Sequence, residues 1–364
     1  MTVEELTITP QEISPAEALG PAQFDWSPVR RVLVVRLRSI GDTVLATPAL
    51  YALRRFLPHA QIDILLEDWV APLLENCADA DRVISVARGS TLARLRLVPQ
   101  LRAARYDVGF NLHGGTTAAL LLRASGARHR VGYADYRYPI LYNHHAPPAA
   151  ELWDAPRTHS VEQQLALPGW LGVPVTDRPP TRLPRHARAE EVVEEKLAGA
   201  GLSAQPFALL HPAAAFASKQ WAAENFARIA EHLETRGLRV VALAAHHEAA
   251  LLGELQAETR IKLLTLTGLS LPEVTALARR ARLFVGNDSG VAHIAAAVGA
   301  PSVVVFGSSN VAHWRPWATA PAVVVREEMP CAPCPGYTCA EYDAPECIRR
   351  VSVERVRGAV DKLL

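Results

Sequence analysis

The run Gly286-Asn287-Asp288-Ser289-Gly290 contains the residue types from which proteins build phosphate sites. It lies between an apolar, β-branched stretch at 283–285 and a helical stretch that begins near Val291. The glycines let a ligand approach the backbone, Asp288 or Ser289 can cap the helix, and the helix start offers free N–H groups. His293, four residues after Ser289, faces the same way. The pattern predicts an anion site, and a capped helix without a ligand is the alternative.

Lysine is scarce, because only four of the 38 Lys and Arg residues are lysines. Lys219 is one of them and lies in a predicted loop, so its role there needs an explanation; a surface lysine is the structural alternative. The motifs G-x-G-x-x-G and G-x-x-x-x-G-K-[ST] are both missing, so the ordinary dinucleotide and P-loop interpretations lack support.

Length and composition indicate a soluble protein of two domains. The chain has 364 residues, 49% of them hydrophobic and 21% charged. No apolar run approaches the roughly 18 residues that span a bilayer. Residues 1–29 hold five acids and no Lys or Arg, whereas a secretory signal needs a basic start. We therefore expect a cytoplasmic protein whose residues 1–28 form a disordered or loosely packed acidic extension.

The net charge of +1 conceals a basic first domain. Residues 30–150 contain 16 Arg, no Lys and nine acids. Such a domain suits an anionic partner, either a charged glycolipid or a membrane surface, and a solvated arginine-rich surface is the alternative. No reading motif for nucleic acid is present, so we expect no nucleic-acid partner.

The elements that must position these residues alternate between strand and helix. Expected strands of the first half cover 31–37, 62–66, 82–86, 107–112 and 131–133, and those of the second half 207–211, 238–244, 262–266, 283–285, 302–306 and 322–325. A long irregular segment is expected at 134–156, and an amphipathic helix at 92–104. The alternation predicts an α/β protein with two doubly wound parallel sheets.

Five segments, taken in order, resemble the bacterial heptosyltransferases of glycosyltransferase family 9. They read VVRLRSIGDTVLATPAL, LHPAAAFASKQW, AAHHE, LTGLSLPEV and VGNDSGVAHIAAAVGAPSV, and the resemblance covers about residues 30–360. It implies the GT-B fold, two Rossmann-like domains facing a central cleft.

The resemblance implies domain bounds as well. The acceptor domain would span 29–178, a proline-rich linker 179–186 and the nucleotide-sugar domain 187–348. A last helix, 349–364, would pack back on the first domain.

The resemblance further implies inverting transfer of heptose from ADP-heptose to an inner-core sugar of the lipid A-core glycolipid. No metal or cofactor would be required. The enzyme would be cytoplasmic and peripheral on the inner face of the inner membrane. The alternatives are a GT-B transferase for another nucleotide sugar and a non-catalytic sugar-nucleotide-binding paralogue.

Site residues follow from matching positions. Asp42 would be the general base, which an inverting transfer needs to take the acceptor proton; its structural alternative is the N-cap of the next helix. Lys219 would contact the leaving diphosphate. The donor site would comprise Glu248 at the ribose, Leu269 at the adenine, and Asp288, Ser289, Gly290 and His293.

Two loops depart from the family pattern. Ala213, Ala214 and Ala215 precede Lys219 where hydroxyl residues are frequent, and Ala244 and Ala245 precede Glu248 where glycine is frequent. They put donor affinity and the fit at the ribose in question. For the acceptor's anionic groups, the candidates are His113, Arg128, Arg130 and Arg137.

Four of the five cysteines cluster near the carboxyl end. Cys331, Cys334, Cys339 and Cys347 are spaced C-x2-C-x4-C-x7-C, and Cys77 is alone. In a cytosolic chain such a cluster is first interpreted as a structural metal site, with zinc ahead of an iron–sulfur cluster. Because the later spacings fit no strong motif, free or incidentally oxidised thiols are favoured, and structural zinc is the alternative.

Overall fold

The computed structural model describes residues 16–334 and 338–364, and its chain divides into two compact units. The amino-terminal unit ends at Pro184 and the carboxy-terminal unit begins at Arg185. The division thus falls within the proline-rich stretch expected to link two domains.

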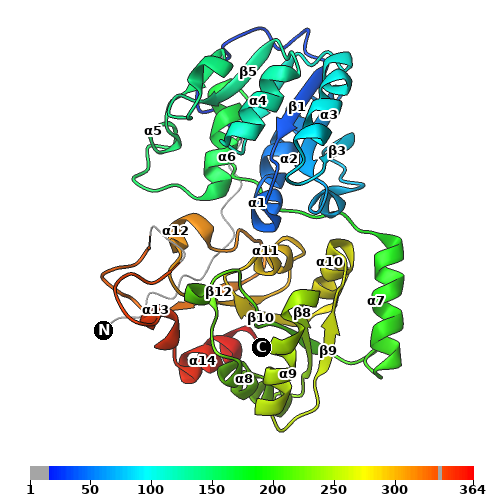
Figure 1. The fold of residues 1–364 in the computed structure, drawn as a ribbon, viewed down its shortest axis with the longest axis vertical. Helices are drawn as coiled ribbons and strands as arrows, with labels where there is room; N and C mark the ends of the chain where they lie inside the picture. Colours follow the sequence, from blue (N-terminus) through cyan, green and yellow to red (C-terminus); the bar gives the residue numbers. More distant parts are fainter. Residues whose placement is uncertain (1–15, 335–337) are drawn as a thin grey trace. The chain divides into compact units, whose positions relative to one another are not determined.

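The amino-terminal unit is built on a six-stranded parallel sheet of order β3-β2-β1-β4-β5-β6 (Figure 1). The central strands are short runs of apolar residues that are buried throughout β4 and in all but the first residue of β1. Burial on both faces is the rule for parallel strands. The strands are β1 Arg31–Val35, β2 Gln61–Glu67, β3 Arg82–Val86, β4 Val108–Asn111, β5 His129–Tyr133 and β6 His144–Ala146.

Helices cover both faces of this sheet. Helices α3 and α4 bury Leu97, Leu101, Leu121 and Leu122 in one core with the strands, and α1 and α2 pack against α6. The segment expected to be irregular, 134–156, holds η2, β6 and α5, so that expectation was wrong. The elements are α1 Ile40–Leu45, α2 Thr47–Phe56, η1 Ala71–Leu74, α3 Thr91–Ala103, α4 Thr116–Ala124, η2 Pro139–Leu141, α5 Ala149–Leu152 and α6 Ser160–Trp170.

The acidic extension is packed from residue 16 onward, which corrects the prediction of a loose segment through residue 28. Phe24 stacks on His129 with ring centroids 3.9 Å apart, and the Trp26 indole donates to the Leu171 carbonyl at 2.8 Å. The backbone of Glu17 accepts from Val175 at 2.7 Å. Two aromatic side chains therefore anchor a segment whose charge alone suggested disorder. Residues 1–15 lie outside the described part.

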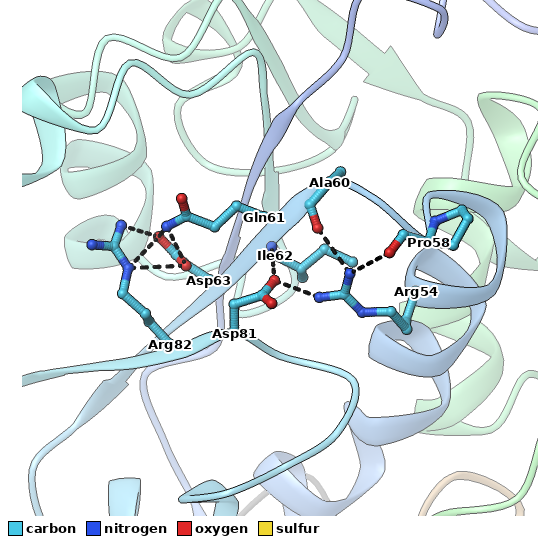
Figure 2. A network of polar contacts seen from close by, with 8 residues as sticks. All are labelled: Arg54, Pro58, Ala60, Gln61, Ile62, Asp63, Asp81 and Arg82. Atoms are coloured by element: carbon cyan, nitrogen blue, oxygen red, sulfur yellow. Dashed lines mark hydrogen bonds and ion pairs between the residues drawn. The ribbon is translucent and has the colours of Figure 1, made fainter.

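Buried and exposed charges tie β2 to β3 and α2 (Figure 2). Asp63 is fully buried and accepts from Arg82 at 2.6 Å, from Gln61 and from the Tyr106 hydroxyl at 2.6 Å. Burial and the Asp63 carboxylate raise the pKa of Tyr106, so its hydroxyl stays a donor. Nearby, Asp81 pairs with Arg54 and accepts from the Ile62 amide.

The carboxy-terminal unit has a second six-stranded parallel sheet, of order β12-β11-β10-β7-β8-β9. Its core joins the strands to α8 and α14, with Trp221 and Phe226 among the largest fully buried side chains. The strands are β7 Phe207–His211, β8 Arg239–Ala244, β9 Leu264–Thr267, β10 Leu283–Asn287, β11 Ser302–Phe306 and β12 Ala322–Arg326.

Helix α14 belongs to this second unit, because Val356, Ala359 and Val360 are buried in the core of its own sheet. The expected packing of the last helix on the first domain stays a prediction. The remaining elements are α7 Ala187–Gly199, η3 Ala217–Lys219, α8 Ala223–Thr235, η4 His246–Glu248, α9 Ala249–Glu258, α10 Leu271–Arg280, α11 Gly290–Ala297, α12 Val311–Trp314, α13 Glu346–Arg349 and α14 Val353–Leu363.

Each sheet has one point at which the strand order reverses. In the first unit it lies between β1 and β4, and in the second between β10 and β7. Ligands of open parallel sheets bind outside the carboxyl ends of the strands at such a point. The predicted fold class, two doubly wound parallel sheets, is confirmed. Within the described residues, none of the helices has the length and apolarity to cross a membrane.

Candidate functional site

Asp42 lies at the reversal point of the first sheet, in the first turn of α1 after β1. Ser39 caps this helix, and Asp42 occupies the third helical position, where its Oδ2 accepts from the Ser39 amide at 3.2 Å and the Ser39 hydroxyl at 3.1 Å. The structural role of Asp42 is therefore that of the acid in a capping box rather than the N-cap itself. Its side chain remains 19% exposed, so a substrate hydroxyl can reach the carboxylate.

Arg36 joins Asp42 to His113 across the reversal point. Its buried guanidinium forms an ion pair with Oδ1 of Asp42 and donates from Nη1 to His113 Nδ1 at 2.9 Å. Asp42 follows β1 and His113 follows β4, the two strands that flank the reversal. Arg36 was not predicted from the sequence. The available signal was an arginine directly after the buried strand RVLVV.

His113 is a neutral side chain in this arrangement. Burial, and then the Arg36 charge, lower its pKa to about 4. Because a guanidinium only donates, Nδ1 must accept, which leaves the proton on Nε2. Asn111 fixes the turn by accepting from the His113 and Gly114 amides at 3.0 Å, and Gly114 has φ +75°.

The three arginines proposed for the acceptor do not gather around Asp42. Arg128 precedes β5 and Arg130 is its second residue, so both lie at the amino end of the strand. The Arg130 guanidinium is occupied by the Leu141 and Ala127 carbonyls at 3.0 and 2.8 Å. Arg137 follows the carboxyl end of β5 and lies over the Tyr138 ring. Of the four candidates, His113 alone contacts the Asp42–Arg36 pair within the described residues.

Lys219 and Asp288 meet at the reversal point of the second sheet. Lys219 ends η3 after β7, Asp288 follows β10, and the ammonium lies 2.8 Å from Asp288 Oδ2. The same oxygen accepts from the Ser309 hydroxyl in the loop after β11. Asp288 is 6% exposed and Lys219 23%, so the cation retains an open side. Three loops thus converge on one ion pair.

Close backbone contacts hold the loops after β7 and β11 together. Ser308 donates from its amide to the Ser218 carbonyl at 3.1 Å and from its hydroxyl to the Ser218 hydroxyl at 2.9 Å. A side chain at Gly307 would place its Cβ 2.1 Å from the Ser218 carbonyl oxygen. The alanine run before Lys219 has no hydroxyl groups. The loop after β11 provides them through Ser308 and Ser309, which was not predicted from the sequence.

Ser289 is the N-cap residue of α11, as expected, but its hydroxyl contacts a side chain of β7 and not a backbone amide of the helix. It lies 3.2 Å from Nδ1 of His211, the last residue of β7. Burial lowers the pKa of His211 to about 4, so a neutral ring holds Ser289. The amides at Gly290 and beyond begin the helix, and His293 is buried one turn later. The expected donor residues from Asp288 to His293 therefore share one strand-to-helix junction.

Glu248 and Leu269 follow the next two strands, β8 and β9. Glu248 Oε2 accepts from the Ala245 amide at 2.9 Å, and the His246 ring of the same turn lies 3.4 Å from the Cβ position of Gly268. Leu269 is the next residue, before α10. Lys219, Asp288, Glu248 and Leu269 therefore follow four successive strands of the sheet, β10-β7-β8-β9, at one edge.

The clustered cysteines are free thiols in the structure. Cys334 lies 3.5 Å from the Cys331 carbonyl, and burial raises the pKa of both Cys334 and Cys347. In the part of the chain that the structure describes, no group of three or more His, Cys, Asp or Glu side chains is arranged to hold a metal. The structural zinc that the spacing offered as an alternative would need these thiols to come together in one ligand set.

Comparison with known proteins supports a common family. The model of glycosyltransferase family 9 (heptosyltransferase) matches residues 94–344. Lipopolysaccharide heptosyltransferase 3 of Escherichia coli is 30% identical over 306 residues, covering 78% of this chain and 85% of that protein.

Solved structures share the fold. The family 9 glycosyl transferase of Veillonella parvula DSM 2008 superposes with a TM-score of 0.80 at 22% identity, covering 96% of this chain and 99% of that one. E. coli heptosyltransferase WaaC with ADP gives 0.69 at 21% identity, covering 92% and 100%. These likenesses agree with the GT-B architecture expected from the sequence. The chain belongs to glycosyltransferase family 9, the heptosyltransferase family, and is a glycosyltransferase.

Proposed function

We propose that this protein transfers heptose from ADP-heptose to an inner-core sugar of a lipid A-core glycolipid, with inversion at the anomeric carbon. The observation that carries the proposal is the placement of two polar clusters at the strand-order reversals of the two sheets. One contains a partly exposed carboxylate, Asp42, and the other a partly exposed cation, Lys219. The E. coli relative is named a lipopolysaccharide heptosyltransferase, and the WaaC structure holds ADP.

Asp42 is proposed as the general base. The acceptor hydroxyl oxygen attacks the anomeric carbon, its proton passes to the carboxylate, and the bond to the ADP oxygen breaks in the same displacement. An ionised carboxylate has about four lone-pair sites. Ser39 and Arg36 occupy part of them and hold the group in one orientation, and the exposed edge is left for the acceptor proton.

Lys219 is proposed to stabilise the charge that develops on the leaving diphosphate. Its open side can face a phosphate while Asp288 and Ser309 hold the ammonium in place. The Ser289 hydroxyl and the Gly290 amide, at the start of α11, would add donors to the phosphates. Glu248 would accept from the ribose hydroxyls, Leu269 would receive the adenine, and His293 would line the sugar pocket.

Donor identity is tested by calorimetric titration with ADP, UDP and GDP. Preference for ADP supports the heptose donor. Preference for UDP or GDP would keep the glycosyltransferase and discard ADP-heptose, and absence of binding to all three would favour the non-catalytic paralogue.

The base is tested with Asp42→Asn and Asp42→Ala. Because general-base catalysis contributes about 10²–10⁴-fold, we expect transfer to fall by at least that factor while ADP affinity stays unchanged. The matched control is Asp68→Asn, an exposed acid in the loop after β2. A fully active Asp42→Ala enzyme would remove Asp42 from this role.

We further propose that the reaction needs no metal and takes place on the cytoplasmic face of the inner membrane. Full activity after dialysis against EDTA is expected. Loss of activity that returns with one divalent cation would contradict the first point, and recovery of the enzyme from washed membranes of its host would test the second.

A further inference from the structure

Large exposed apolar side chains gather on three neighbouring elements of the amino-terminal unit. Leu92 and Leu95 on α3 are 56% and 63% exposed, Leu120 on α4 is 54% exposed, and Ile140 on η2 is 87% exposed. They are four of the seven large apolar residues that the described chain exposes. Scattered exposed leucines need no explanation, but a group on adjacent elements does.

The three elements form one layer over the sheet. Helix α3 packs against α4 and β3, and α4 packs against η2, β4 and β1; Figure 1 labels both helices in the amino-terminal unit. The Arg102 guanidinium of α3 donates to the Ala124 carbonyl at the end of α4, at 3.1 Å. Their inner side chains enter a common core, Leu97 and Leu101 from α3 and Leu121 from α4. The exposed leucines of both helices therefore lie on the outer side of the layer.

The sequence expectation of a conventional amphipathic helix at 92–104 does not describe α3. At 100° per residue, Leu92, Leu95 and Pro99 fall within one outward sector, opposite Leu97 and Leu101. The helix is therefore apolar on both sides, and the outer side remains uncovered in this chain.

The surroundings of this face are strongly basic. Residues 82–141, which include all three elements, contain ten arginines and two acids, Asp107 and Asp135. The Asp107 carboxylate is occupied at the amino end of the sheet, where Oδ2 accepts from the Arg30 and Arg31 amides at 2.9 and 3.0 Å. Arg96 on α3 and Arg123 on α4 are exposed among the apolar residues. The face thus offers aliphatic side chains in surroundings where arginines far outnumber acids.

We propose that this outer face of α3, α4 and η2, called the α3–α4 face, docks the enzyme reversibly on an anionic membrane surface. Aliphatic side chains would enter the boundary between head groups and acyl chains, and arginines would pair with lipid phosphates. The charge of the face complements a lipid surface of opposite sign.

The inference rests on the proposed function in one respect, the membrane-embedded acceptor. Helix α4 begins at Thr116, three residues after His113, which contacts the Asp42–Arg36 pair. His113, at the junction between β4 and α4, therefore connects the docking face to the proposed base through Arg36. An enzyme held by this face would have its proposed base close to a lipid-bound acceptor.

Sedimentation with vesicles tests the proposal without donor or acceptor. Wild-type protein should bind phosphatidylcholine vesicles that contain phosphatidylglycerol, release with rising salt, and bind pure phosphatidylcholine weakly. The variants are Leu92→Ser with Leu95→Ser, Leu120→Ser with Ile140→Ser, and Arg96→Glu with Arg123→Glu. Each pair should weaken binding by roughly tenfold or more.

Matched controls place the same changes elsewhere. Arg239→Glu and Leu364→Ser alter exposed residues of the carboxy-terminal unit and should bind vesicles like wild type. Because all six changed side chains of the face are solvent-exposed, unchanged melting temperatures are expected. A variant that melts early is replaced by alanine at the same positions.

Transfer assays distinguish failure of the docking face from failure of the proposed function. The leucine variants should retain transfer to a delipidated, water-soluble acceptor and lose it on acceptor embedded in anionic vesicles. Wild-type binding that ignores phosphatidylglycerol, or variants that bind like wild type, would overturn the docking face even if ADP-heptose proves to be the donor. Vesicle binding without turnover would instead leave the docking face standing and refute the proposed reaction.

Discussion

At Arg36 one buried guanidinium contacts both the proposed base and the neutral imidazole beside it. We infer that it positions Asp42, because a two-armed cation fixes a carboxylate more tightly than capping bonds alone. Arg36→Met should lower kcat by roughly tenfold or more with little change in KM for the donor. It should also raise the pKa of His113 from about 4, since the Arg36 charge is one of its causes. NMR titration of the His113 ring measures this shift.

Arg36→Lys is the second variant to test, because lysine keeps the positive charge but lacks the planar guanidinium with its two donor groups. Partial recovery of kcat is expected from it, with the pKa of His113 again low. Arg239→Met, in the other unit, controls for arginine loss as such. A Met variant with normal kcat and an unmoved His113 titration would show that the ion pair is only structural.

Among individual residues, the sequence predicted those that directly follow a strand. It missed those whose partners come from a neighbouring strand. Asp42, Lys219 and Ser289 could be predicted because each occupies a strand-loop-helix junction with a recognisable local pattern. Arg36 and Ser309 could not, since their partners are 6 to 77 positions away and the pairing depends on which strands are neighbours. The placement of Arg128 and Arg130 was missed because strand direction decides which end of β5 they occupy.

Among the elements, the loop after β11 depends on one glycine. A methyl group at Gly307 would lie 2.1 Å from the Ser218 carbonyl oxygen, which is backbone and cannot swing away. Gly307→Ala should therefore push the β11 loop from η3, destabilise the unit by about 1–3 kcal/mol, and weaken ADP binding through Lys219 and Ser309. Calorimetry and thermal melting report both effects. Gly253→Ala in α9 is the control, because nothing lies within 4 Å of its Cβ and alanine favours a helix.

Elements with strong periodicity were predicted, and short or aromatic-anchored ones were not. The runs that became β1, β7, β10 and β11 are apolar apart from one polar residue at an end, Arg31, His211, Asn287 and Ser302 respectively. Strand β6 has three residues, His144–Ala146, too few for any period to show. The segment at 16–28 looked loose by charge, and it is held by Phe24 and Trp26 against residues far along the chain. Helix α14 carries no local signal for the unit that it joins.

For the whole molecule, each unit contains a neutral histidine at its reversal point, half-buried in the first unit and buried in the second. His113 in the first and His211 in the second both have a pKa lowered from 6.5 to about 4. Burial also lowers the pKa of His129 and His144 in the first unit. In the unfolded chain these side chains take up protons near pH 6.5. Acid therefore favours unfolding of both units through the residues that shape their sites.

These pKa values give the direction of the pH effect on folding stability and the pH range over which it acts. A folded pKa below the unfolded value contributes stability that is complete above pH 6.5 and is lost as pH falls toward 4. For His211 the difference corresponds to about 3 kcal/mol at most. Urea unfolding should give constant stability from about pH 7 to 8 and a steady decline below about pH 6.5. His211→Asn, which can still bond Ser289, should flatten the decline for the carboxy-terminal unit and leave that of the amino-terminal unit unchanged. An equally steep decline in this variant would show that carboxylates, and not His211, govern the acid response of the second unit.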